Sequence, residues 1–126
     1  MKRGWIGVGL LTVILILGFL TSWWMGKIHS RIAVDLDRAA GYALAENWEQ
    51  AAAYAQKAKN HWQKRWHFSA AFADHEPMEN IDSQLSQLSS LASARDEVTF
   101  AALCAQLSRQ MEAMGEAHSL NWWNLL

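Results

Sequence analysis

The side chains best suited to chemistry lie in FADHEPMENID, residues 72–82, which holds four carboxylates, one histidine and the only proline of the chain. In a helix, His75, Glu79 and Asp82 would follow one another at i, i+4 and i+7 and would share one face. Joined by a second histidine from elsewhere, such a face can bind a divalent metal ion. The chain has no HExxH motif and only one cysteine, so these three residues are metal-ligand candidates without a supporting motif.

The same residues also have the features of a helix start. Pro77 suits the first turn of a helix, where its missing N–H would have no partner. Acidic side chains such as Asp74 and Glu79 interact favourably with the positive end of the helix dipole, by about 0.3–1 kcal/mol each. We therefore predict that a helix begins here, that His75 pairs with a carboxylate to fix two helices together, and that no metal is bound.

A second group, KAKNHWQKRWHF at residues 57–68, mixes cations with aromatic rings. Such a run could contact anionic lipid, a polyanionic wall polymer or nucleic acid. Trp62 and Trp66 are four residues apart on an alanine-rich helical face, however, which favours buried rings with the cations facing water. Residues 27–126 carry nine Lys and Arg against twelve Asp and Glu, so no nucleic acid partner is expected.

The chain closes on SLNWWNLL, in which Trp122 and Trp123 are adjacent. Two neighbouring side chains cannot both point to the same side of one helix. We expect at least one of these rings to bind a groove of the protein, the membrane interface or a partner.

Catalytic groups are otherwise scarce. Cys104 is the only cysteine, so no internal disulfide can form, and its apolar neighbours predict a buried, unreactive thiol. The sequence has no nucleophile elbow, no phosphate loop and no acid–base pair with a convincing pocket. We therefore predict no catalytic residue and no cofactor, and we do not expect an enzyme.

The first 26 residues indicate a membrane anchor. Trp5 to Met25 is a run of 21 residues without a charge, long enough as a helix to cross a hydrocarbon core of about 30 Å. A cleaved signal peptide is the alternative, but bulky residues occupy the place where small ones should precede a cleavage site. Lys2 and Arg3 favour an amino terminus in the cytosol and the remainder outside the cytoplasmic membrane, in a single pass.

Beyond the anchor, the hydrophobic period is helical almost throughout, which predicts an all-α fold. The membrane helix is expected to continue into the first of four helices. Asn47 is a predicted N-cap, and Gly115 a predicted helix stop. The expected helices cover 27–45, 48–73, 77–93 and 97–114.

The links near Glu46 and Arg95 are only about three residues long, so each pair of consecutive helices should be antiparallel. We therefore predict a four-helix bundle of two stacked hairpins over 27–115, followed by a tail over 116–126. Trp48, Trp62 and Trp66 should lie on one face of the second helix.

Taken in order, several segments resemble the family called domain of unknown function 4363, small membrane-anchored helical proteins of spore-forming bacteria. The carriers are the basic start with its apolar anchor, ENWEQA, the HW…RW pair, DHEPMENID with the leucines that follow, and the final SLN…NLL. Pro77 and the inserted Trp122 and Trp123 depart from the family pattern. The resemblance implies an α-helical protein with one anchor and no assigned activity, accessory to a multi-spanning membrane protein.

Together these features lead us to expect a non-enzymatic extracytoplasmic interaction module, held at the lipid bilayer by residues 5–25. The alternative is a helical domain that senses a ligand or a metal through the face formed by His75, Glu79 and Asp82.

Overall fold

The computed structural model describes the backbone of residues 2–69 and 75–123, and the side chains of residues 2–67 and 77–116. These ranges contain four helices and no strand, which confirms the all-α prediction. In chain order the helices are α1 (Lys2–Leu44), α2 (Trp48–Ser69), α3 (His75–Ala94) and α4 (Glu97–Trp123).

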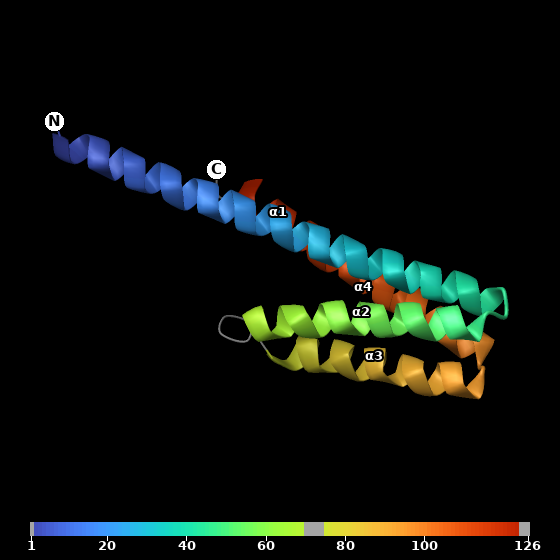
Figure 1. Cartoon of the computed structure of the whole chain (residues 1–126). Coiled ribbons are helices and arrows are strands. Elements are labelled where there is room, and N and C mark those ends of the chain that lie inside the picture. The colour runs from blue at the N-terminus through green and yellow to red at the C-terminus, as the bar shows by residue number, and fades with distance from the viewer. Residues whose placement is uncertain (1, 70–74, 124–126) are drawn as a thin grey trace.

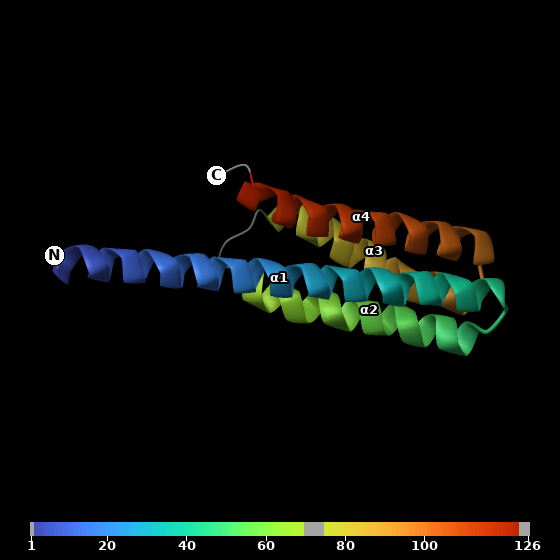
Figure 2. The ribbon, with the colours of Figure 1, turned by 90° about the horizontal axis from the view of Figure 1, so that it is seen from above.

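The four helices form a bundle in which the hairpin of α1 and α2 lies against the hairpin of α3 and α4 (Figures 1 and 2). α1 packs on α2 and α4, and α3 packs on the same two helices from the other side. Each helix is antiparallel to the next, as the short links require. The predicted bundle of two stacked hairpins is therefore confirmed.

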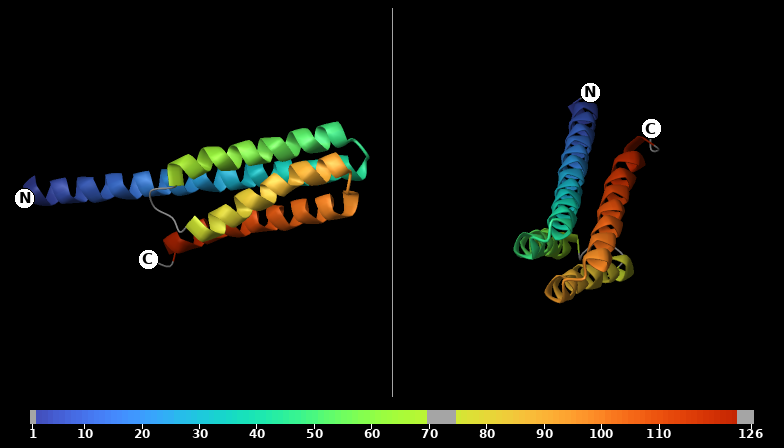
Figure 3. Two further views of the ribbon diagram at one scale, coloured as in Figure 1. Left: turned by 90° about the horizontal axis from the view of Figure 1, so that it is seen from below. Right: turned by 90° about the vertical axis from the view of Figure 1, so that its right-hand side faces the viewer.

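α1 is much longer than the bundle. Its 43 residues correspond to about 65 Å of helix, and the amino-terminal half extends beyond the other three helices (Figure 3). This half is long and apolar enough to cross a membrane, and none of its most apolar window is buried within the protein. The hydroxyls of Thr12 and Thr21 donate to the carbonyls of Val8 and Leu17 at 2.8 and 2.7 Å, so the helix itself satisfies them.

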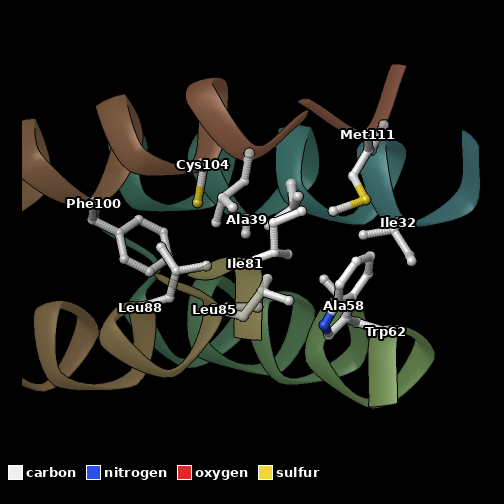
Figure 4. Close-up of a cluster of buried hydrophobic side chains, with 14 of the residues drawn as sticks. Ile32, Ala39, Ala58, Trp62, Ile81, Leu85, Leu88, Phe100, Cys104 and Met111 are labelled. Carbon is white, nitrogen blue, oxygen red and sulfur yellow. The ribbon is translucent and has the colours of Figure 1, made fainter. Parts of the chain in front are cut away.

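The core lies between the helices and is built from one apolar stripe of each (Figure 4). On α2 the buried positions follow steps of four, three and four residues, which leaves Ala52 exposed. Leu44 at the end of α1 is also exposed. The largest fully buried apolar side chains are Ile32, Leu36, Trp62, Leu85, Leu88, Phe100, Leu107 and Met111.

The two hairpins close with the same turn. After α1, the N–H of Asn47 donates to the carbonyl of Tyr42 at 2.9 Å and the N–H of Glu46 to that of Ala43 at 3.0 Å. This is a Schellman motif, and Glu46 takes the left-handed φ of 59° that glycine usually provides. Asn47 Oδ1 then accepts the N–H of Gln50 at 3.3 Å, which places Asn47 at the N-cap as predicted.

After α3, Arg95 has the left-handed φ of 53° and the N–H of Asp96 donates to the carbonyl of Leu91 at 3.1 Å. Asp96 Oδ1 accepts the N–H of Thr99 at 3.2 Å and so caps α4. Both links therefore reverse the chain within a few residues without a glycine or a proline.

The prediction that Gly115 ends the fourth helix is wrong, because α4 continues to Trp123. Gly115 has no positive φ, so it does not form the left-handed cap on which that prediction rested. Instead it lies where α4 approaches α1, and a Cβ built on it would be 3.6 Å from Cβ of His29. Residues 116–123 are therefore helical rather than a separate tail.

Candidate functional site

The acidic segment forms the start of α3, which begins at His75. Glu79 is exposed and Asp82 half-buried, and both line an open groove with Trp66 and His67 of α2. Asp74 and the side chain of His75 lie outside the described residues. Among the side chains that the structure describes, no three His, Cys, Asp or Glu come together as metal ligands. Metal binding by His75, Glu79 and Asp82 therefore remains an untested alternative.

The tryptophans of α2 occupy three different environments. Trp62 is fully buried and lies beside Ala58 and Ile32 in the core (Figure 4). Trp48 is half-buried and packs edge-on against Phe100, with 5.6 Å between ring centroids and 76° between planes. Trp66 is half-buried against the core and also lines the groove beside Glu79. The backbone of Trp122 and Trp123 ends α4, and their side chains lie outside the described residues.

One cation of the basic run, Arg65, is buried instead of facing water as predicted. Lys57 and Lys64 are exposed, as expected for cations that face water, but Arg65 is only 8% exposed. Its guanidinium carbon lies 5.5 Å from the centre of the Trp62 ring, within the range of a cation–π contact. The expectation that all cations of this run face water is wrong for Arg65. Successive side chains of a helix point in different directions, so Arg65 points toward α1 although its neighbour Lys64 points to solvent.

Arg65 meets a buried histidine on α1. His29 is 1% exposed, its Nδ1 lies 3.0 Å from the carbonyl oxygen of Met25, and its Nε2 contacts Nη1 of Arg65. A carbonyl can only accept a hydrogen bond and a guanidinium can only donate one. The two contacts fit a His29 ring that donates through Nδ1 and accepts through Nε2.

A second polar pair joins the same two helices. Asp35 is 5% exposed, and its Oδ2 accepts a hydrogen bond from Nδ1 of His61 at 3.2 Å. Nearby, on the α4 side of α1, Ser108 donates to the carbonyl of Ala33 at 3.4 Å. Buried polar groups with defined partners fix how neighbouring helices are aligned, since any other alignment leaves them unpaired.

Arg65 has one hydrogen-bond partner among the described residues, the ring of His29. Its Nε has no hydrogen-bond partner, and no carboxylate among the described side chains forms an ion pair with it. Burial lowers the pKa of Arg65 from its usual value, since desolvation disfavours the charged form. The result is a buried cation whose charge the described part of the chain does not neutralise.

Arg65 also helps to form a groove of about 260 Å³ between α1 and α2, which we call the collar groove. α1 contributes Trp24, Met25, Ile28 and Arg31, and α2 contributes His61, Lys64 and Arg65. Among the residues that the structure describes, no acidic one lines the groove, which lies where the apolar half of α1 enters the bundle. Next to it, Nζ of Lys27 lies 3.7 Å from the centre of the Trp23 ring.

Sequence reasoning did not single out His29, Asp35 or Arg65. A signal was present on α1, since His29 lies three residues before Ile32 and seven before Leu36 and so shares their buried stripe. Arg65 likewise lies three residues after Trp62 and continues the buried stripe of α2, but its charge argues against burial.

Cys104 is fully buried in the core. Burial, with a smaller contribution from Asp37, raises the pKa of its thiol to about 12. The thiol therefore stays protonated at neutral pH, and a protonated thiol is a poor nucleophile and metal ligand.

The fold is a four-helix bundle whose first helix extends beyond the others and is long and apolar enough to cross a membrane. The chain belongs to the family described as Domain of unknown function (DUF4363), whose model matches residues 23–125. The match covers the bundle and confirms the resemblance inferred from the sequence. Comparisons with curated proteins and with solved structures found no match.

Proposed function

We propose that this protein is a non-enzymatic, membrane-anchored interaction module, accessory to a multi-spanning membrane protein. The observation that carries the proposal is the amino-terminal half of α1, which is apolar on every side, unburied and continuous with the bundle. A helix that is apolar all round needs an apolar environment, and no described part of the bundle buries its most apolar stretch.

The continuity of α1 supports an anchor that is retained rather than cleaved. Leader peptides are cut after small residues, whereas Trp24 and Met25 are large and lie within the helix. Both also line the collar groove, and the carbonyl of Met25 accepts the hydrogen bond from buried His29. Cleavage ahead of Lys27 would therefore remove part of the bundle.

In the proposed topology the amino terminus is cytosolic and the bundle extracytoplasmic, in keeping with Lys2 and Arg3 before the apolar segment. Protease added to intact cells should digest a carboxy-terminal tag, while an amino-terminal tag should be cut only after the membrane is permeabilised. The reverse pattern would overturn the proposed orientation and leave the anchor in place.

An interaction role fits the surface better than catalysis does. The grooves between the described side chains are open, and the single cysteine is sealed in the core with a raised pKa. A catalytic site needs converging polar groups around a position where substrate can react. The polar groups that do converge, around His29 and Asp35, are buried between helices and bond to one another or to the backbone.

The partner is tested by purification from gently solubilised membranes with a carboxy-terminal tag. We expect a multi-spanning membrane protein at a fixed ratio to the bait, and recovery of the bait when the tag is moved to that partner. The control replaces residues 5–25 with an unrelated single-pass segment of equal length, which separates contacts made by the anchor from those made by the bundle. Recovery of the bait alone, in several mild detergents, would overturn the accessory role.

A further inference from the structure

The collar groove combines cationic and apolar side chains at one level of the molecule. Arg31, Lys64 and Arg65 provide the cations, and Trp24, Met25 and Ile28 provide the apolar surface. Asp35 of α1, which does not line the groove, accepts a hydrogen bond from His61. The described lining of the groove is therefore positively charged and holds no acidic side chain.

Arg65 is the strongest sign that a ligand belongs here. A buried guanidinium is costly unless an anion or several acceptors compensate its lost hydration. In this structure Arg65 has one neutral acceptor, Nε2 of His29, while its Nε has no partner. Arg65 also forms part of the groove wall, so an anion in the groove would lie beside its charge.

The position of the groove indicates which anion this is. Trp24 ends the apolar segment, and tryptophan favours the level of lipid headgroups. Leu20 and Leu17 lie four and seven residues before Trp24 on the same face of α1, and both are exposed. An amphiphile whose headgroup occupies the groove could therefore lay an acyl chain along this face.

We propose that the collar groove binds the phosphate of an anionic phospholipid, with Arg65, Lys64 and Arg31 around the headgroup and its chains along the apolar half of α1. The inference rests on the proposed function only in requiring that α1 lies in the bilayer. Phosphate is the shared chemistry of lipid and free inorganic phosphate, and the apolar wall of Trp24, Met25 and Ile28 favours the lipid. Binding would fix the height and tilt of the bundle at the membrane surface.

The test uses the full chain in a mild non-ionic detergent. Phosphatidylglycerol or phosphatidylcholine with identical chains is added, and bound lipid is counted by native mass spectrometry. We expect one phosphatidylglycerol to be retained in preference to phosphatidylcholine. The exposed pair Arg31→Gln/Lys64→Gln should weaken this retention at least about tenfold, since each cation near an anionic lipid contributes about a factor of five.

The matched control is Arg38→Gln/Lys57→Gln, which removes the same charge from exposed positions of the same two helices that do not line the collar groove. It should retain phosphatidylglycerol like the unmodified chain. Arg65→Gln should lose it as well, and circular dichroism of that variant shows whether the fold survives.

Equal retention of both lipids, or equal losses in the two double variants, would overturn the inference. A further outcome is that millimolar inorganic phosphate displaces the lipid and, on its own, raises the melting temperature as much as the lipid does. That result would assign the groove to the free anion and would also overturn the inference. Flotation with membranes is measured in parallel. A chain that does not float but selects phosphatidylglycerol in detergent contradicts the anchor and not the lipid site, so the two failures are distinguishable.

Discussion

At the scale of single residues, Trp62 and Trp66 differ although they are one helical turn apart. Trp62 is fully buried among core side chains, whereas Trp66 is half-buried and borders an open groove. Removal of a fully buried aromatic ring leaves a cavity and costs about 3–5 kcal/mol. Part of the Trp66 ring already faces solvent, so its removal should cost about half as much.

We therefore expect Trp62→Ala to lower the free energy of unfolding by about 3–5 kcal/mol and Trp66→Ala by about 1.5–2.5 kcal/mol. Thermal and denaturant unfolding of the full chain in mild detergent, followed by circular dichroism, measures both. Trp48→Phe is a suitable control, since it preserves an aromatic edge against Phe100. Equal losses at the two positions would mean that Trp66 is buried more deeply than the structure places it.

Only part of the candidate site could be predicted from the pattern of residues in the sequence. Periodicity predicted the burial of Trp62, because its position on the alanine-rich face of α2 repeats the helical period. Position 65 continues the same stripe, but charged side chains are rarely buried, so the pattern did not lead to Arg65. The collar groove depends on the alignment of α1 with α2, and no local pattern in either helix specifies that alignment.

At the scale of elements, both hairpins depend on a residue that adopts a left-handed backbone without being glycine. The helices around Glu46 and Arg95 could be predicted from capping residues and short links, but the conformation of these two residues could not. Asparagine, aspartate and glycine are the residues usually expected there. The prediction that Gly115 ends the fourth helix is wrong for a related reason. A glycine caps a helix end only where it adopts the left-handed conformation, and Gly115 does not.

The left-handed conformation costs a residue with a side chain about 1–2 kcal/mol, and glycine loses about 0.5–1 kcal/mol through its more flexible unfolded state. We therefore expect Glu46→Gly and Arg95→Gly each to stabilise the bundle by about 0.5–1 kcal/mol. Both side chains are exposed, so few contacts are lost. Melting temperatures measure the effect. Glu46→Ala keeps a side chain in the left-handed conformation and should not raise the melting temperature. A gain from alanine equal to that from glycine would point to the side-chain charge as the cause.

At the scale of the whole molecule, α1 belongs to two environments. Within the described part of the chain, none of the most apolar stretch of its amino-terminal half is buried, while its second half supplies His29, Ile32, Leu36, Ala39 and other residues to the core. The anchor and the bundle therefore share one helix, and the contacts described between them lie at the level of Trp24 and Met25. The stability of the bundle should follow from residues beyond Trp24 alone.

We accordingly expect residues 25–126, freed of the apolar segment, to form a soluble helical protein that unfolds cooperatively. Met25 is kept because its carbonyl accepts the hydrogen bond from His29. A chain that starts at residue 37 is the control, since it lacks Ile32 and Leu36 from the core and should not fold. Circular dichroism and chemical denaturation measure both chains.

The state of the shortened chain also bears on the collar groove. If residues 25–126 fold with a sharp transition, packing alone holds the groove together, and Arg65 is buried before any lipid arrives. A helical chain without cooperative unfolding would mean that the bundle is completed at the membrane surface. The alignment of α1 with α2 would then depend on an anion beside Arg65, and phosphatidylglycerol should restore cooperativity to the full chain but not to Arg31→Gln/Lys64→Gln.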